Sequence, residues 1–242
     1  MNPLRIAMWS GPRNISTAMM RSWENRDDCA VIDEPFYAHY LQRTGADHPG
    51  REEVIENDEP NEARVLQRIL GPPPGDCAIY YQKHMAHHLL AGMDRSWMDA
   101  FAHAFLIRCP RDMMTSLQVR LGEFTAEETG LPQQLEIFES IRKREGRIPP
   151  VIDSRDVLTD PRRVIGLLTE ALGVGFQQSM LSWEAGKRES DGVWAHHWYD
   201  RVWESTGFAP YRPKTVEVPE ELEEVLHTIQ PIYDRLYEER LH

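Results

Sequence analysis

The stretch from Leu4 to Trp23 places the tightest limits on what this chain can fold into. An apolar run is followed by a Gly-Pro turn, and Ser16 and Thr17 then open a segment with the apolar spacing of a helix. This order predicts a strand, a tight loop and a helix. The unpaired N–H groups and the dipole at a helix N-terminus favour an anion. We therefore expect the loop, which contains Arg13, to bind a phosphate group.

Short apolar runs alternate with helical patterns along the rest of the chain. Further strands are predicted at residues 29–33, 77–81, 102–107 and 150–153, and helices at 61–70, 85–93, from about 111, 131–144 and 160–172. Residues 184–214 lack periodicity and predict a long lid-like loop, and residues 219–241 predict a C-terminal helix. This alternation predicts an α/β fold with a central, mostly parallel sheet flanked by helices. Because no repeat or linker separates two cores, residues 1–242 are expected to form a single domain.

Polar side chains follow the ends of several predicted strands. They are Arg13, Glu34, His84 and Arg108. In parallel sheets, ligands bind beyond the carboxyl ends of the strands. We therefore expect these side chains to meet in one crevice.

Composition excludes several classes of partner. A net charge of −12 argues against nucleic-acid or anionic-membrane binding, so an anionic ligand needs a local basic pocket. Cys29, Cys77 and Cys109 form no paired motif, which argues against a disulfide framework and a zinc site. The first residues lack a leader pattern and no stretch of about 18 residues is apolar, so a soluble cytoplasmic protein is expected. His84 and His88 are spaced for a metal on a helix, but no further ligand completes a set, so no metal is expected.

The first loop is not a nucleotide triphosphatase loop, because it lacks the Gly-Lys-Ser/Thr sequence. Its order, Pro12-Arg13-x-x-Ser16-Thr17 after a strand, resembles the 5′-phosphosulfate loop of P-loop sulfotransferases. Asn14 and Ile15 stand where Ser-Gly is common in that family.

A second segment, residues 105–117, resembles the 3′-phosphate segment of the same family. Its strand is followed by Arg-x-Pro-x-Asp-x-x-x-Ser, with Arg108 and Ser116 in the two binding positions. A guanidinium at a strand end can form paired hydrogen bonds with a phosphate while a helix hydroxyl binds a third oxygen.

Weaker matches follow in the family's order. Residues 81–90 resemble a segment that carries a catalytic histidine, which would be His84, with Gln82 where lysine is usual. Residues 153–161 resemble a segment near the adenine, with Ser154 in place of a tyrosine, and residues 187–194 resemble the family's lid. The sequence also resembles a bacterial and plant sulfotransferase-like group, in which Glu34 is a second candidate base.

The resemblance implies 3′-phosphoadenosine 5′-phosphosulfate as the co-substrate and in-line transfer of its sulfuryl group to a small-molecule acceptor, without a metal. It implies catalytic roles for His84, Glu34 and Arg13. The implied donor-binding residues are Arg13, Asn14, Ser16, Thr17, Arg108, Ser116, Lys187 and Arg188.

Two alternatives remain at this point. One is a P-loop kinase or nucleotide hydrolase, and the other is a non-catalytic nucleotide-binding module of the same fold. The sequence does not indicate the acceptor or the oligomeric state, nor does it decide between the two candidate bases. His196 and His197 either line an acceptor pocket or pack the lid.

Overall fold

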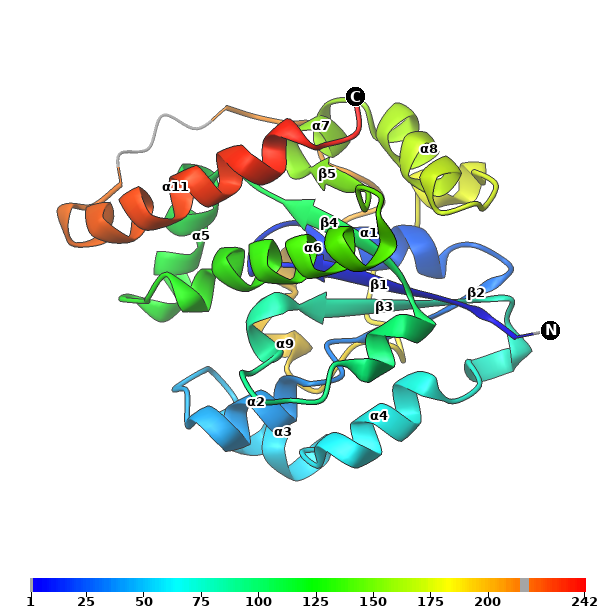
Figure 1. The fold of residues 1–242 in the computed structure, drawn as a ribbon, viewed down its shortest axis with the longest axis horizontal. Coiled ribbons are helices and arrows are strands. Elements are labelled where there is room, and N and C mark those ends of the chain that lie inside the picture. Colours follow the sequence, from blue (N-terminus) through cyan, green and yellow to red (C-terminus); the bar gives the residue numbers. More distant parts are fainter. Residues whose placement is uncertain (1, 214–217) are drawn as a thin grey trace.

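One parallel sheet forms the centre of the protein (Figure 1). The computed structural model describes residues 2–213 and 218–242. The strands are β1 (Leu4–Ser10), β2 (Cys29–Asp33), β3 (Ile79–Met85), β4 (Ala102–Ile107) and β5 (Val151–Asp153). Their order is β2-β3-β1-β4-β5, and every neighbouring pair is parallel. The predicted α/β fold with a central parallel sheet is therefore confirmed.

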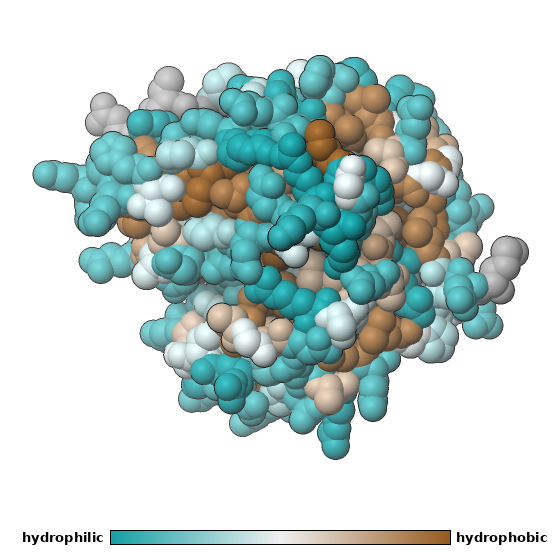
Figure 2. Space-filling view, viewed as in Figure 1, coloured by the Kyte–Doolittle hydropathy of each residue, from teal (hydrophilic) through white to brown (hydrophobic). Residues whose placement is uncertain are grey.

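Helices cover both faces of this sheet (Figure 1). They are α1 (Ser16–Glu24), α2 (Tyr37–Thr44), α3 (Arg51–Asn57), α4 (Glu62–Leu70), α5 (Pro110–Leu121), α6 (Leu131–Glu145), α7 (Ser154–Thr159), α8 (Pro161–Ala171), α9 (Ala195–Trp198), α10 (Asp200–Trp203) and α11 (Glu223–Glu238). Among the residues described, no helix is long and apolar enough to cross a membrane. The face drawn in Figure 2 is mostly hydrophilic, with apolar residues in separate patches.

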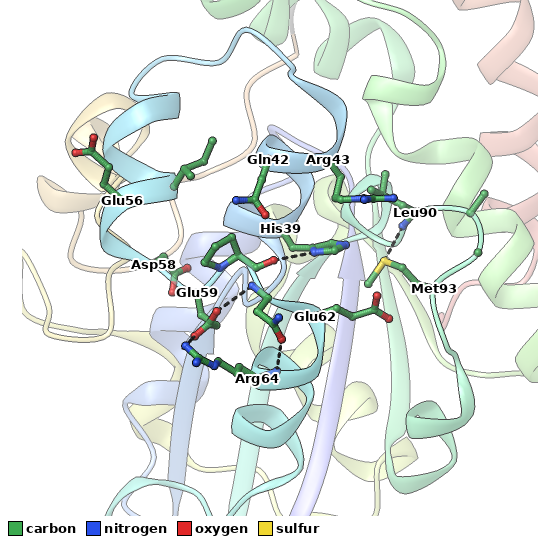
Figure 3. A pocket seen from close by; sticks show the side chains of 15 residues that line it. His39, Gln42, Arg43, Glu56, Asp58, Glu59, Glu62, Arg64, Leu90 and Met93 are labelled. Atoms are coloured by element: carbon green, nitrogen blue, oxygen red, sulfur yellow. Dashed lines mark hydrogen bonds and ion pairs between the residues drawn. The ribbon is translucent and has the colours of Figure 1, made fainter.

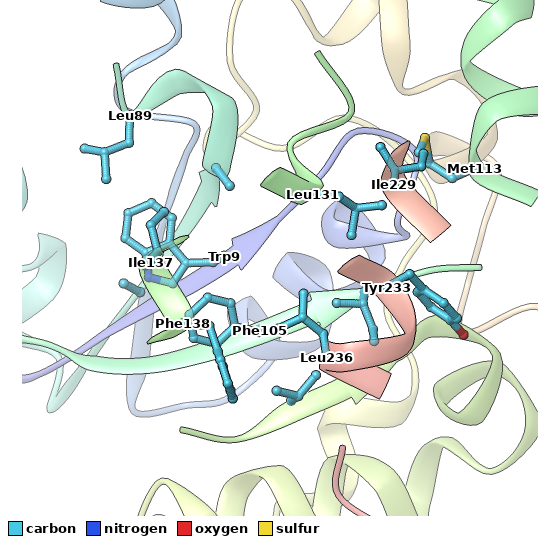
Figure 4. Close-up of a cluster of buried hydrophobic side chains, with 14 of the residues drawn as sticks. Trp9, Leu89, Phe105, Met113, Leu131, Ile137, Phe138, Ile229, Tyr233 and Leu236 are labelled. Atoms are coloured by element: carbon cyan, nitrogen blue, oxygen red, sulfur yellow. The ribbon is translucent and has the colours of Figure 1, made fainter. Parts of the chain in front are cut away.

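Two apolar clusters hold the helices to the sheet. On one face, α5, α6 and α11 pack against β1 and β4, and Figure 4 shows this cluster around Trp9 and Phe105. On the other face, α1, α7 and α8 cover the sheet, and Trp23 stacks on Tyr81 with ring centroids 5.2 Å apart. Because both faces of the sheet are covered, its strands carry buried apolar residues on both sides, and the polar residues of β3 are buried with them.

The order of the strands places a crevice beyond β1. From β1 the sheet grows in both directions, toward β3 and β2 on one side and toward β4 and β5 on the other. Ligands of such sheets bind at this switch point, outside the carboxyl ends of the strands. The loop that joins β1 to α1 lies at that position.

The prediction for residues 77–93 is wrong in one important respect. The third strand is Ile79–Met85 and not residues 77–81, and the expected helix at 85–93 is reduced to a short turn, Ala86–His88. All residues of β3 are buried, including its polar ones. Polar side chains inside a strand resemble a strand end in the sequence, because apolar patterning alone cannot distinguish the two.

Two other segments differ from the prediction in detail. The lid-like loop at 184–214 contains the short helices α9 and α10 in its described part, and residue 214 lies outside the described residues. The C-terminal helix begins at Glu223, after a short turn at Glu220–Leu222.

Candidate active site

The loop between β1 and α1 has an unusual backbone. Arg13 and Ile15 adopt left-handed conformations, with φ of 61° and 60°, on either side of Asn14. Such a conformation costs a residue other than glycine about 1–2 kcal/mol. A change of handedness along a loop turns successive N–H groups toward one side and forms a concave site for an anion. Ile15 thus adopts the conformation that glycine adopts more readily.

Contacts from distant segments hold this loop. A Cβ atom on Gly11 would lie 2.2 Å from the carbonyl oxygen of Thr129, so only glycine fits there. The Asn14 side-chain amide donates to the carbonyl oxygen of Leu106 at 3.2 Å, and Asn14 is buried. Gln134 of α6 donates to the carbonyl oxygens of Trp9 and Leu106. This placement gives the Asn14 side chain a role in fixing the loop, and its predicted contact with the donor stays a prediction.

The first turn of α1 is available for an anion. Ser16 and Thr17 begin this helix and are buried. In the described part of the chain, no side chain caps the helix at Ile15. The first N–H groups of a helix have no partner within it. Together with the positive end of the helix dipole, they favour an anion at this position, and phosphate binding here stays a prediction.

The structure joins the two predicted phosphate-binding motifs. Arg13 Nε donates to Ser116 Oγ at 3.0 Å. Arg108 donates through Nη1 to the carbonyl oxygen of Arg13 at 2.5 Å, although the two residues are 95 positions apart. Two guanidinium groups and one hydroxyl therefore lie together beyond the ends of β1 and β4.

Positive charge is concentrated around Arg13. Burial and the charges of Arg120, Arg108 and Arg201 lower the pKa of Arg13 to about 10. Burial also lowers the pKa of Arg108. Like charges in a partly buried site disfavour one another, and a bound anion would relieve this repulsion. In a chain of net charge −12, this cluster is a local concentration of positive charge of the kind that an anionic ligand would need.

Arg120 and Arg201 were not among the predicted residues. Arg120 follows Ser116 by one helical turn on α5, so the two share a face of that helix. This spacing is a signal that the sequence contained. Arg120 also pairs with Asp200 of α10 at 3.1 Å, which ties the lid segment to α5.

The predicted lid cations have other partners. Lys187 Nζ lies over the ring of Trp203, 4.7 Å from its centroid, and Arg188 donates to the carbonyl oxygen of Glu184. Both contacts stay within the lid segment. Within the described residues, the contacts of Lys187 and Arg188 do not include Arg13, Arg108 or Ser116, so their predicted contact with the donor stays a prediction.

A second charged group lies at the ends of β2 and β3. Lys83 Nζ contacts Asp33 Oδ1 at 2.8 Å and Glu34 Oε1 at 2.7 Å. It also donates to the Tyr199 hydroxyl at 2.6 Å, and that hydroxyl donates to Asp33 Oδ2 at 2.6 Å. All four residues are buried. One cation thus forms ion pairs with two carboxylates, and a tyrosine of the lid segment packs against them.

This arrangement changes the acidity of Glu34. Burial raises the pKa of the Glu34 carboxyl group, and the Lys83 charge opposes that shift only in part because Asp33 shares it. The pKa of Lys83 is raised: burial opposes this, but the charges of Asp33 and Glu34 outweigh it. Glu34 also has a left-handed backbone, with φ of 38°. Strained backbone of this kind concentrates at functional sites.

His84 does not lie in the crevice, contrary to the prediction. Its ring is buried beside Trp9, with centroids 4.8 Å apart, and its Nε2 lies 3.2 Å from Gln82 Oε1. Burial lowers its pKa to about 3. The physical reason is the length of β3: inside a strand, neighbouring side chains point to opposite faces, so His84 points away from Lys83. This position does not support the predicted role of His84 as the base.

Aromatic and histidine side chains lie next to Glu34. The backbone N–H of Tyr37 donates to the carbonyl oxygen of Glu34 at 2.9 Å, and the Tyr37 ring stacks on His88 with centroids 4.8 Å apart. His87 and His88 are buried, and in the described part of the chain their Nδ1 atoms have no hydrogen-bond partner. Unpaired buried nitrogen atoms are unfavourable, so His87 and His88 are polar groups whose burial is not offset by a hydrogen bond among the described residues.

An open cavity of about 970 Å³ lies on the other side of α2 (Figure 3). His39, Gln42 and Arg43 line it, whereas Tyr37 and Tyr40 are on the opposite face of that helix. Figure 3 shows Glu56, Asp58, Glu59 and Glu62 at this cavity. Its acidic lining does not suit an anionic donor.

Comparison with known proteins gives distant relatives along nearly the whole chain. Two curated proteins of Arabidopsis thaliana match, Branched-chain-amino-acid aminotransferase-like protein 2 (33% identical over 231 residues) and protein 1 (35% over 234). The matches cover 96% and 97% of this chain but 41% and 42% of those proteins, so this chain spans well under half the length of these relatives.

Solved structures show the same fold. The sulfotransferase domain of the Synechococcus PCC 7002 olefin synthase has a TM-score of 0.54 at 18% identity and covers 95% of each chain. The sulfotransferase domain of the curacin biosynthetic pathway has a TM-score of 0.50 at 15% identity and covers 94% of this chain and 98% of that one. A sulfotransferase of Alicyclobacillus acidocaldarius gives 0.50 at 14%, covering 100% and 98%.

The family comparison agrees with the resemblance in the sequence. The sulfotransferase domain family matches residues 4–239, which include the β1 loop, Glu34, Lys83 and Arg108. The predicted family is thus confirmed, and the chain belongs to the sulfotransferase domain family.

Proposed function

We propose that the protein transfers a sulfuryl group from 3′-phosphoadenosine 5′-phosphosulfate to a small-molecule acceptor. The observation that carries this proposal is the junction of Arg13, Ser116 and Arg108 at an uncapped helix N-terminus. A donor with two separate phosphate groups needs two anion-binding positions. The helix N-terminus suits one of them, and the Arg108 side suits the other.

On the donor side, the proposed ligands are groups of this chain that carry positive charge. The N–H groups at the start of α1 and the Arg13 guanidinium would hold the phosphate that bears the sulfuryl group. Arg108 and Ser116 would hold the second phosphate, because a guanidinium and a hydroxyl together satisfy several of its oxygens. Preformed donors of this kind stabilise charge that develops on a leaving group.

The proposed reaction is a single displacement at sulfur. The acceptor oxygen or nitrogen attacks the sulfur and forms a new bond, and the bond from sulfur to the bridging phosphate oxygen breaks. That oxygen keeps the electron pair, and Arg13 and the α1 N–H groups stabilise its charge. The acceptor's proton passes to the base. Positioning of this kind supplies much of the catalysis in the related transfer of phosphoryl groups.

Glu34 is the proposed base, because its position fits this task better than that of His84. It lies at the end of β2, at the same edge of the sheet as the β1 loop, and burial raises its pKa above the ordinary value of a glutamate. Carboxylates used as bases are raised in this way. The Lys83 ammonium at 2.7 Å would keep Glu34 ionised before the transfer.

The acceptor remains a class of small molecules with a nucleophilic hydroxyl or amine. The neighbouring Tyr37, His87 and His88 would orient it, since the Nδ1 atoms of His87 and His88 have no hydrogen-bond partner in the part of the chain that the structure describes. The three cysteines are free, which supports a reducing compartment such as the cytoplasm.

The experiment is a donor-dependent transfer assay on the purified chain with phenol, alcohol, amine and sugar acceptors. Formation of adenosine 3′,5′-bisphosphate that depends on an acceptor supports the proposal. Magnesium-dependent ATP turnover without sulfuryl transfer would favour a kinase or hydrolase instead. Thermal stabilisation by adenosine 3′,5′-bisphosphate with no transfer to any acceptor would favour a non-catalytic module.

A further inference from the structure

Away from the β1 loop, three metal-ligating side chains converge on one point. Glu53 lies on α3, and His196 and His197 lie on α9. Glu53 Oε2 is 3.3 Å from His196 Nε2 and 3.6 Å from His197 Nε2. One ligand atom from each of the three lies within 4.8 Å of the others. Two distant segments of the chain thus present two imidazoles and a carboxylate to one another.

These separations fit a metal site. In a tetrahedral zinc site with bonds of about 2.0–2.1 Å, neighbouring ligand atoms lie about 3.3 Å apart. Charge-assisted hydrogen bonds are shorter, at about 2.7–2.9 Å. Both distances from Glu53 exceed that range.

The two rings lie against each other, with centroids 3.8 Å apart, and contacts with the backbone hold them. His196 Nδ1 lies 2.9 Å from the carbonyl oxygen of Val193. A carbonyl oxygen accepts only, so Nδ1 carries the proton and the Nε2 lone pair of a neutral ring faces Glu53. A backbone carbonyl in this role is usual for ligating histidines. The His197 ring lies against Gly50, where an added Cβ would be 2.5 Å from Nε2.

We propose that Glu53, His196 and His197 form a binding site for a divalent transition metal of the zinc class. Two imidazoles and one carboxylate suit Zn²⁺, and water would complete its four-coordinate shell. The side chains are 45%, 45% and 30% exposed, so an ion can reach all three from solvent. The proposal of a metal site does not rest on the proposed sulfuryl transfer.

The proposed metal site would connect the lid segment to the helices beside the Lys83 group. α9 belongs to the same segment as Asp191 and Tyr199, which contact Arg21 and the Asp33–Lys83 pair. α3 packs against α2, whose residue Tyr37 lies beside Glu34. Figure 1 shows α2, α3 and α9 gathered at one end of the molecule. A metal that bridges α3 and α9 would therefore fix the lid segment over the Lys83 group.

The test is metal titration of the full chain without an affinity tag, after treatment with a chelator. Zn²⁺ is titrated by calorimetry and Co²⁺ by visible absorption, which reports tetrahedral coordination. We expect one site per chain, and we expect His197→Ala and Glu53→Gln each to weaken it by roughly 10-fold or more. His227→Ala, at an exposed histidine of α11, is the matched control and should bind as the wild type does.

Limited proteolysis gives a second readout. Zn²⁺ should slow cleavage within residues 184–203 of the wild type and of His227→Ala, but not of His197→Ala. Circular dichroism confirms that each variant is folded. The proposal is overturned if Co²⁺ does not bind, if both ligand variants bind as the wild type does, or if thiolate charge-transfer bands assign the metal to cysteine.

Discussion

The β1 loop and the ends of β2 and β3 carry charges at the same edge of the sheet, but they arrange those charges differently. Around Arg13 the charges are mostly of one sign, and burial together with these charges lowers the pKa of Arg13. Around Lys83 the charges are of both signs and are paired at 2.7–2.8 Å in the interior. One region repels its own charges, and the other balances them.

This difference separates the two tasks of the proposed reaction. A cluster of like charges gains most when an anion arrives, so it suits the binding of a donor and the stabilisation of its leaving group. The buried ion pairs of Lys83 with Asp33 and Glu34 need no ligand to balance their charges. Their surroundings set the pKa of each group and so suit proton transfer. Changes in the first region should therefore affect ligand binding, and changes in the second should affect folding and proton transfer.

The largest expected effect is the loss of folding stability in mild acid. It tests whether the buried histidines near the second region are neutral residues of the core. Burial lowers the pKa of His84 and His87 to about 3 and that of His103 to about 4. The unfolded chain binds protons at these histidines below about pH 6.5 whereas the folded chain does not, so stability falls as the pH decreases. Between pH 7 and pH 5 each of these histidines lowers the free energy of unfolding by roughly 2 kcal/mol.

Urea denaturation as a function of pH measures this loss. His84→Gln should reduce the loss of stability between pH 7 and pH 5 by the contribution of one histidine. Sulfuryl transfer by this variant should stay measurable. A free energy of unfolding that stays constant between pH 7 and pH 5 would show that these rings are not buried as neutral groups.

Removal of Lys83 should give the next largest effect. Lys83→Ala leaves Asp33 and Glu34 buried without their cation, which costs about 3–5 kcal/mol. The matched control is Lys143→Ala on the exposed side of α6, with an expected change within about 0.5 kcal/mol. The comparison is contradicted if chemical denaturation gives the two variants equal stability.

A substitution in the first region should weaken binding and leave folding nearly unchanged. Arg108→Ala removes one guanidinium from the anion site, and we expect the affinity for adenosine 3′,5′-bisphosphate to fall by about 10- to 100-fold, or about 1.5–3 kcal/mol. Arg111→Ala, at an exposed position of α5, the helix that follows Arg108, is the control. Isothermal calorimetry measures both, and equal affinities would exclude Arg108 from the anion site.

The two regions also differ in how well the sequence predicted them. Arg13, Arg108 and Ser116 lie in contiguous motifs that follow strands, and the structure joins them. Loop position and helix start are local properties, so short segments determine them. The helical spacing from Ser116 is enough to place Arg120 on the same face of α5.

The Lys83 group depends on three distant segments. A third strand that ends at Tyr81 places His84 outside the sheet, whereas the observed end at Met85 places Lys83 and His84 on opposite faces. The register then sets Lys83 beside Asp33. Tyr199 comes from a segment without periodicity, so no local pattern predicts its contact.

The catalytic role of Glu34 is the central claim of this account. Glu34→Gln keeps the size of the side chain and its oxygen near Lys83 but cannot accept a proton as a carboxylate does. We expect kcat for sulfuryl transfer to fall by about 100-fold or more. Thermal stabilisation by adenosine 3′,5′-bisphosphate should persist, because the donor site lies at the β1 loop.

The most direct measurement is single-turnover formation of adenosine 3′,5′-bisphosphate by the wild type, Glu34→Gln and the exposed control Glu170→Gln. The account predicts a slow Glu34→Gln reaction with normal donor binding, and a wild-type rate for Glu170→Gln. A Glu34→Gln variant that transfers the sulfuryl group at the wild-type rate would contradict it.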